Sequence, residues 1–134
     1  FENYPYEGIN DLLKSLKQNG GRLFVATCKP AAFARKIIKN YKFNDLFEYI
    51  SGAMMNGKRE TKPEVIEYII KRFRLDLSET IMIGDRLHDV EGAHKNNIKC
   101  VYVTYGCGSR MEAESCKADY IVDNVKDLSK IFNT

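Results

Sequence analysis

Residues 79–93, ETIMIGDRLHDVEGA, change from a strand pattern to a helix pattern within a few positions. The apolar run at 81–83 predicts a short buried strand, and this strand ends at Gly84. A helical pattern begins shortly after that glycine. Asp85 and Asp89 stand four residues apart at this junction, so a helix that has already begun there projects both carboxylates from one side.

The junction is a candidate ligand site. In an open α/β sheet, ligands bind outside the carboxyl ends of the strands, which is where these two carboxylates are expected. Carboxylate oxygens next to a glycine backbone suit a hard cation such as Mg²⁺. The alternative is that one aspartate caps the helix while the other is a solvated surface residue. The junction alone leaves both interpretations open.

The composition is that of one ordinary globular domain over residues 1–134. The chain is 44% apolar and 29% charged, which is enough for one core but short for two. Its net charge of +3 is spread along the sequence, so we expect no nucleic-acid partner. The longest apolar runs have about five residues, and we therefore expect no membrane span. No secretory leader is visible.

The cysteines are not arranged as metal ligands. Cys28, Cys100, Cys107 and Cys116 show no Cys-x-x-Cys spacing and no histidine at zinc-ligand intervals. We expect them to be reduced thiols in a cytoplasmic protein, with disulfides or a metal cluster as the less favoured alternative.

Strand and helix patterns alternate along the chain. Strands are expected over 22–26, 48–52, 81–83, 100–104 and 120–122. Helices are expected over 9–18, 32–41 and 62–73, from near 87 to about 96, and over 111–117 and 125–132. Alternation without hairpin patterns is typical of βαβ units, so the sequence predicts an α/β fold with a parallel sheet.

Polar residues at three of these positions should meet at one edge of the sheet. Thr27 closes the first strand, and with the Cys28 amide it precedes a helix, which is a natural place to bind an anion. Lys62 opens another helix, and Asp85 and Asp89 complete the set. A hydroxyl, a lysine and two carboxylates make sense together if the ligand is a phosphate with Mg²⁺. Taken singly, the threonine could be a helix cap and the lysine an ordinary surface residue.

The joint pattern resembles the haloacid dehalogenase superfamily of Mg²⁺-dependent phosphohydrolases. The family's strand ending in Thr or Ser is matched at 23–27, its lysine followed by proline at 62–63, and its Gly-Asp-x-x-x-Asp at 84–89. Three further stretches look like the phosphoglycolate phosphatase branch and its 5'-nucleotidase-like relatives: 4–8, 104–110 and 118–123. The resemblance implies a three-layer, Rossmann-like parallel sheet with helices on both faces.

The resemblance also implies roles for individual residues. Thr27 and the Cys28 amide would bind the transferring phosphoryl group, and Lys62 would stabilise the aspartyl-phosphate and its nucleophile. Asp85 would be a direct Mg²⁺ ligand. Asp89 would hold Lys62 or a metal-bound water. These assignments make Thr27, Lys62 and Asp89 the expected catalytic residues and the two aspartates the expected metal site.

One of these positions departs from the family pattern. Many relatives carry asparagine where this chain has Cys28, but the expected contact is made by the backbone N–H, which any residue supplies. A reactive-thiol role for Cys28 is a minor alternative, because a helix N-terminus lowers the pKa of a thiol. The loop at 106–110 would border the site.

The family's first motif, Asp-x-Asp, occurs nowhere in the chain. That motif supplies the nucleophile and the general acid/base, and its strand lies in the middle of the family's sheet. The helical cap that selects substrate is absent as well. Since the sequence begins at Phe1, we expect a fragment whose missing strand comes from an N-terminal segment or from a second copy by strand exchange. Such a fragment would be inactive alone.

The expected function is hydrolysis of a small phosphorylated metabolite. Phosphoglycolate and nucleoside monophosphates are both compatible with the pattern. The alternative is a non-catalytic phosphate-binding or interaction module built on the same scaffold. A receiver-like or flavodoxin-like domain is less favoured, because receivers need an acidic cluster on an early strand and this chain has none.

Overall fold

The computed structural model describes residues 8–30, 36, 39, 45–53, 61–105 and 108–132. The helices are α1 (Ile9–Gln18), α3 (Lys62–Phe73), α4 (Leu87–Lys95), α5 (Arg110–Ser115) and α6 (Val125–Phe132). The strands are β1 (Phe24–Pro30), β2 (Tyr49–Ala53), β3 (Ile81–Gly84), β4 (Lys99–Val103) and β5 (Tyr120–Val122). A short 3₁₀ turn, Leu77–Glu79, precedes β3. The helix expected over 32–41 lies outside the described residues, apart from two helical positions, 36 and 39.

All the strand pairs are parallel, and this confirms the predicted α/β class. β1 pairs with β2, and β4 lies between β3 and β5. Within the described residues the strands form these two sheets, and no ladder joins β1 to β3. The strand expected between them therefore remains a prediction.

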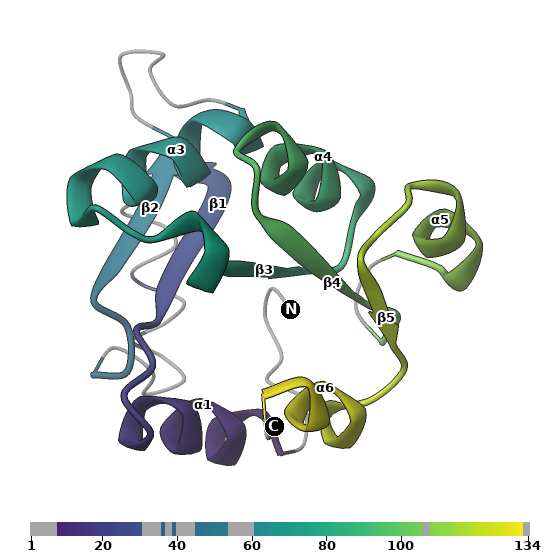
Figure 1. Ribbon diagram of the computed structural model, residues 1–134, viewed down its shortest axis with the longest axis horizontal. Coiled ribbons are helices and arrows are strands. Elements are labelled where there is room, and N and C mark those ends of the chain that lie inside the picture. The colour runs from purple at the N-terminus through teal and green to yellow at the C-terminus, as the bar shows by residue number, and fades with distance from the viewer. Residues whose placement is uncertain are drawn as a thin grey trace.

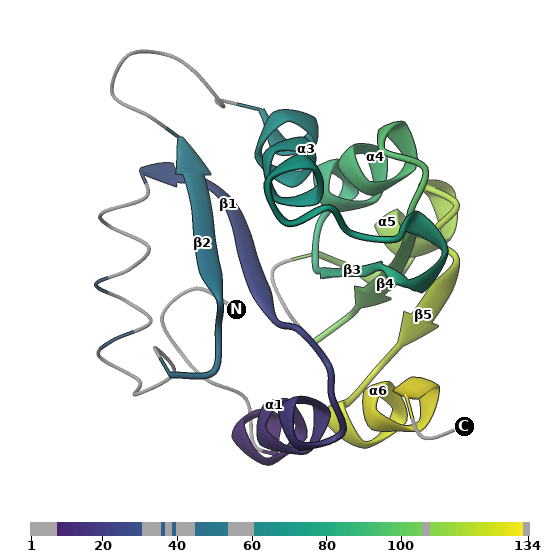
Figure 2. The same cartoon turned by 60° about the vertical axis from the view of Figure 1, so that its left-hand side comes forward.

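Helices cover both sides of the strands, as the three-layer architecture requires. α3 and α4 lie side by side on one side, and α1 and α6 lie together on the other (Figure 1). The rotated view separates the same two helical layers (Figure 2). No helix in the described part of the chain is long and apolar enough to cross a membrane.

β4 joins the two halves of the core because it is buried on both faces. Val101 and Val103 point to one side and Cys100 and Tyr102 to the other, as the two-residue period of a strand dictates. The first pair packs against the α1 and α6 side, together with Ile9, Leu12, Leu13, Val122 and Leu128. The second pair packs against the α3, α4 and α5 side, together with Ile66, Val90, Ala93, Ile98 and Ala113.

The end of β1 corrects one prediction. The strand was expected to end at Ala26, but β1 continues to Pro30. Its regular register with β2 runs from Phe24 to Ala26, becomes irregular, and resumes where Pro30 pairs with Ala53. Thr27, which was expected to close the strand, therefore lies within it, at the irregularity.

Candidate active site

Lys62 forms the central contact of the candidate site. Its Nζ donates a hydrogen bond to the Ala26 carbonyl oxygen at 3.2 Å and lies 2.7 Å from Asp89 Oδ1. The side chains of Lys62 and Asp89 are only 9% and 6% exposed. Because Ala26 belongs to β1 and Asp89 to α4, this one ammonium group connects the first sheet with the helix that follows β3. Gly92 makes room for the lysine stem, since a Cβ there would lie 2.8 Å from Lys62 Cγ.

Asp89 fixes the turn between β3 and α4. Its Oδ2 accepts the backbone N–H of Asp85 at 3.0 Å and that of Arg86 at 3.3 Å, as expected for a carboxylate in the first helical turn. Its Oδ1 is buried and accepts no hydrogen bond from the described residues, so its contact with Lys62 is an ion pair. Gly84 is required here, because a Cβ at that position would lie 2.5 Å from Asp89 Oδ2.

The predicted residues of three elements are thus linked by contacts. Thr27, which is half-buried, directly follows the Ala26 carbonyl that contacts Lys62. Lys62 contacts Asp89, and Asp89 holds the amide of Asp85. The Cys28 side chain is exposed. The helix whose N-terminus was expected to help these amides bind an anion falls outside the described residues.

Asp85 and Asp89 suit part of a Mg²⁺ site. Both offer carboxylate oxygens, but those of Asp89 are already engaged by Lys62 Nζ and by the Asp85 and Arg86 amides, so Asp85 is the candidate for the direct ligand. The described residues contain no cluster of three or more His, Cys, Asp or Glu side chains that could hold a metal. Mg²⁺ is usually held by one or two carboxylates together with waters and substrate phosphates, so this donor set fits the ion.

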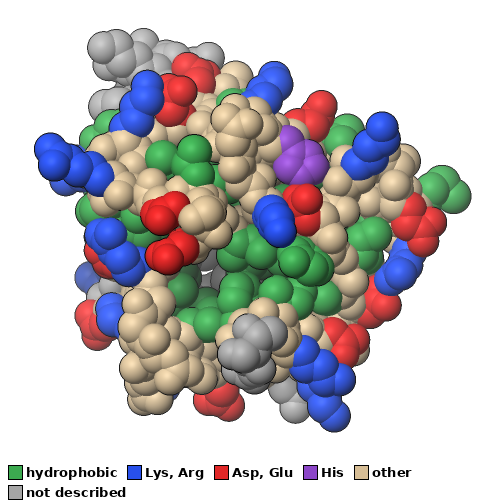
Figure 3. Space-filling view, in the orientation of Figure 1, with side chains coloured by type: hydrophobic (Ala, Val, Ile, Leu, Met, Phe, Trp, Pro, Cys, Tyr) green, Lys and Arg blue, Asp and Glu red, His purple; other side chains and the backbone are tan. Residues whose placement is uncertain are grey.

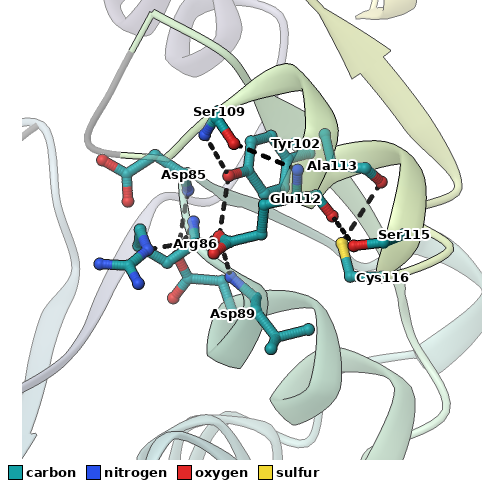
Figure 4. Close-up of polar contacts among 10 residues, drawn as sticks. Asp85, Arg86, Asp89, Tyr102, Ser109, Glu112, Ala113, Ser115 and Cys116 are labelled. Atoms are coloured by element: carbon teal, nitrogen blue, oxygen red, sulfur yellow. Dashed lines mark hydrogen bonds and ion pairs between the residues drawn. The ribbon is translucent and has the colours of Figure 1, made fainter.

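A third carboxylate near this turn was not predicted from the sequence. Glu112 Oε1, on α5, accepts the Leu87 backbone N–H at 2.8 Å, Arg86 Nε at 3.3 Å and the Tyr102 hydroxyl at 2.9 Å. Asp85 points away from this group, as Figure 4 shows. The local pattern Ser109-x-x-Glu112 marks a helix start but gives no hint of these distant contacts.

The hydrogen bond between Tyr102 and Glu112 shifts the pKa of both side chains. It lowers the pKa of Glu112. Burial, together with the same bond, raises the pKa of Tyr102 to about 12. The pair therefore consists of a neutral phenol and an ionised carboxylate at neutral pH.

Thr104 and Arg110, at the two ends of the loop after β4, both form hydrogen bonds with Asp123. Thr104 donates its hydroxyl to Asp123 at 2.7 Å, and Arg110 Nη1 donates to both oxygens of that carboxylate at 2.8 and 2.9 Å. The Thr104 bond is the main cause that lowers the pKa of Asp123. Arg110 is therefore engaged with the end of β5. Residues 106 and 107 lie outside the described part.

Three of the four cysteines lie in the described part of the chain. Cys28, Cys100 and Cys116 form no disulfide. Burial raises the pKa of the Cys100 thiol, which makes it unreactive. Cys107 falls outside the described residues.

Comparison with known proteins gives consistent matches. The family model described as haloacid dehalogenase-like hydrolase matches residues 2–103. The fold is similar to a crystal structure described as a predicted phosphatase from Clostridium acetobutylicum, with a TM-score of 0.91 and 43% identity. That match covers 95% of this chain and 59% of the Clostridium chain.

Curated relatives carry more than one functional name. A 5'-nucleotidase from Pseudomonas aeruginosa is 34% identical over 134 residues, all of this chain and 61% of that protein. Tyrosine-protein kinase PtkA from Mycobacterium tuberculosis is 38% identical over 106 residues, 79% of this chain and 36% of that protein. Other relatives are named phosphoglycolate phosphatase. The chain thus spans about three-fifths or less of the length of these proteins. The relatives named 5'-nucleotidase and phosphoglycolate phosphatase confirm the predicted branch of the family.

Proposed function

This chain belongs to the haloacid dehalogenase-like hydrolases, and from that premise we propose that it is the core of a Mg²⁺-dependent phosphatase acting on a phosphomonoester through an aspartyl-phosphate. The observation that carries the proposal is the contact series from the Ala26 carbonyl through Lys62 and Asp89 to the Asp85 amide. A buried ammonium and two carboxylates close to the carboxyl end of β3 suit an anion bound with a cation.

Each residue has a role in this proposal. Thr27 and the Cys28 amide bind the phosphoryl oxygens, and Lys62 balances their negative charge. Asp85 is the direct ligand of Mg²⁺, while Asp89 orients Lys62 and shares the metal's surroundings. When bound, Mg²⁺ neutralises further charge on the phosphate and orients it. Lys62 and the Asp85 turn are held in place before substrate arrives, which lowers the cost of ordering them in the transition state.

The nucleophile in this proposal comes from outside these 134 residues, because the sequence contains no Asp-x-Asp. The same segment would supply the strand between β1 and β3, either from the same polypeptide or from a second copy. Hydrophobic side chains surround a hollow in the middle of the face drawn in Figure 3, over the space between the two sheets. Such a surface suits an added apolar strand.

The proposed substrate is a small phosphorylated metabolite. The names of the relatives favour a nucleoside monophosphate or phosphoglycolate. We propose no nucleic-acid or membrane partner, and a cytoplasmic location in which free cysteines stay reduced.

The test is hydrolysis of p-nitrophenyl phosphate by protein expressed from the complete coding sequence. We expect Mg²⁺-dependent release of phosphate that EDTA abolishes. Asp85→Asn should lower the rate by at least about a hundredfold, because it removes the charged metal ligand. Asp11→Asn, an exposed position on α1, is the matched control and should keep the parent rate. An Asp85→Asn protein with the parent rate would contradict the metal assignment.

A second candidate is a non-catalytic phosphate-binding module, and the missing acidic pair is the observation that favours it. It predicts that the protein from the complete coding sequence contains no Asp-x-Asp and hydrolyses no phosphate ester. Inorganic phosphate should still bind, and Lys62→Met should weaken that binding. The sequence of the complete gene and the hydrolysis assay together separate the two functions.

A further inference from the structure

We propose that Glu112, held by Tyr102, is a positioning residue that fixes the Asp85–Leu87 turn for Mg²⁺ binding. The inference rests on the proposed function, because the turn matters only if Asp85 binds the ion. It adds to the site a residue that lies on α5, 25 residues or more from the turn it holds.

The first argument is the backbone of α4. Leu87 is the first residue of this helix, so its N–H has no partner within the helix. Arg86 precedes it and has no side-chain acceptor with which to cap the helix. Glu112 Oε1 accepts the Leu87 N–H at 2.8 Å and thereby takes the role of the missing cap. Two carboxylates therefore hold the turn: Asp89, on α4, accepts the Asp85 N–H, and Glu112, on α5, accepts the Leu87 N–H.

The second argument is the charge of Arg86. Its guanidinium is next to the candidate metal ligand in sequence, and its side chain is 45% exposed. Glu112 Oε1 accepts a hydrogen bond from Arg86 Nε at 3.3 Å, although the guanidinium and the Asp85 carboxylate lie on the same side of the turn (Figure 4). A released guanidinium could pair with Asp85 and compete with a cation for the same oxygens.

The third argument is that Glu112 is itself held rigidly. Tyr102 is fully buried on β4, and its hydroxyl donates to Glu112 Oε1 while accepting the Ser109 N–H at 3.1 Å. A Cβ on Gly108 would overlap this hydroxyl and the Asp85 carbonyl oxygen, so the loop lies directly against both. The Tyr102 hydroxyl therefore links Glu112, which holds the Asp85–Leu87 turn, to the loop that borders the site.

The experiment measures Mg²⁺ affinity by calorimetry, with protein expressed from the complete coding sequence. Glu112→Ala should weaken Mg²⁺ binding about 10- to 100-fold, the range found when partners of metal ligands are removed. Tyr102→Phe should weaken it less, because Glu112 keeps its other two contacts. Glu114→Ala, on the same helix and exposed, removes the same charge and should leave the affinity unchanged.

A second readout excludes a purely structural effect. The Mg²⁺ concentration for half-maximal phosphatase rate should rise in Glu112→Ala, and kcat should recover at saturating Mg²⁺. Glu112→Gln, which keeps an acceptor for Leu87 but no charge for Arg86, should fall between Glu112→Ala and the parent, and Arg86→Gln in the same protein should restore part of the loss. If Glu112→Ala does not fold, Glu112→Gln alone and Glu112→Gln combined with Arg86→Gln replace it in the test.

The outcomes separate the two proposals. If Asp85→Asn loses Mg²⁺ binding while the Glu112 and Tyr102 variants bind as the parent does, the positioning role is overturned and the proposed function stands. If Asp85→Asn binds Mg²⁺ as the parent does, the metal site is wrong and both proposals are overturned. Weakened binding in Glu112→Ala that saturating Mg²⁺ reverses supports both.

Discussion

At the scale of single residues, Lys62 connects the stability of the fold to the candidate chemistry. A lysine buried to 9% exposure is stable only if its charge is compensated, and here Asp89 and the Ala26 carbonyl compensate it. Asp89 in turn is 6% exposed and depends on Lys62. The residue proposed to bind phosphate is therefore also the residue that keeps a buried carboxylate paired.

Removing one partner of this pair should cost much more than removing both. Lys62→Met leaves the Asp89 charge buried and unpaired, and should lower the free energy of unfolding by about 3–5 kcal/mol. Asp89→Asn in the same protein removes that charge and keeps an acceptor for the Asp85 N–H, so the double variant should be more stable than Lys62→Met alone. Urea unfolding of the variants checks this.

The control is Lys71→Met on the exposed face of α3. Lys71 is 75% exposed and pairs with Glu67 at 3.5 Å, so its loss should cost at most about 0.5 kcal/mol. Additive effects of Lys62→Met and Asp89→Asn would mean that the buried pair does not couple the two sites.

The residues of the site divide into those that sequence could find and those it could not. Lys62 and Asp85 were predicted because one starts a helix and the other follows the end of a strand, which sequence patterns mark, and Thr27 was predicted because it follows an apolar run. Glu112 and Tyr102 escaped because their contacts depend on how α5 packs against the turn. No periodicity along the chain encodes such a contact.

At the scale of elements, α3 shows how a helix start positions a functional side chain. Glu64 Oε1 accepts the Thr61 N–H at 3.2 Å and the Thr61 hydroxyl at 2.7 Å, which closes the first turn around Lys62. Pro63 adds a fixed backbone angle where no N–H is needed. The sequence predicted the bounds of α3 correctly because these start residues and the apolar spacing agree.

Glu64→Ala should therefore destabilise the protein more than an ordinary surface substitution. It removes the acceptor for two donors and a negative charge at a helix N-terminus, and we expect a loss of about 1 kcal/mol in the free energy of unfolding. Glu67→Ala is the matched control, since it lies in the middle of the same helix and loses only an exposed ion pair. Equal effects of the two substitutions, measured by thermal unfolding, would argue against a role for the helix start.

The element that sequence placed least well was β1. Its predicted end at Ala26 followed from the apolar run, but pairing with β2 resumes at Pro30 after an irregular stretch. Hydrophobicity reports which side chains are buried and does not report such a break in register. The error matters for Thr27, whose backbone lies at this irregularity.

At the scale of the whole molecule, the two sheets have no backbone ladder between them in the described residues, and a side chain connects the first sheet to the helix that follows β3. Lys62 reaches from β1 to α4, but no ladder connects β1 with β3 in the described part of the chain. Ile83, on β3, is 36% exposed although it is a large apolar residue. The alternating pattern predicted the class of the fold, whereas the strand expected between the two sheets is still a prediction, since no ladder among the described residues joins them.

We therefore predict that a strand from outside the 134 residues pairs with both β1 and β3. Each backbone group left unpaired there costs about 1–3 kcal/mol if buried, so the added strand should stabilise the protein strongly. Hydrogen exchange should show slow amides in β1 and β3 of protein from the complete coding sequence. The 134-residue chain alone should exchange faster at these strands, or form dimers by strand exchange. A monomeric 134-residue chain with equally slow exchange at β1 and β3 would show that the sheet is complete without another strand.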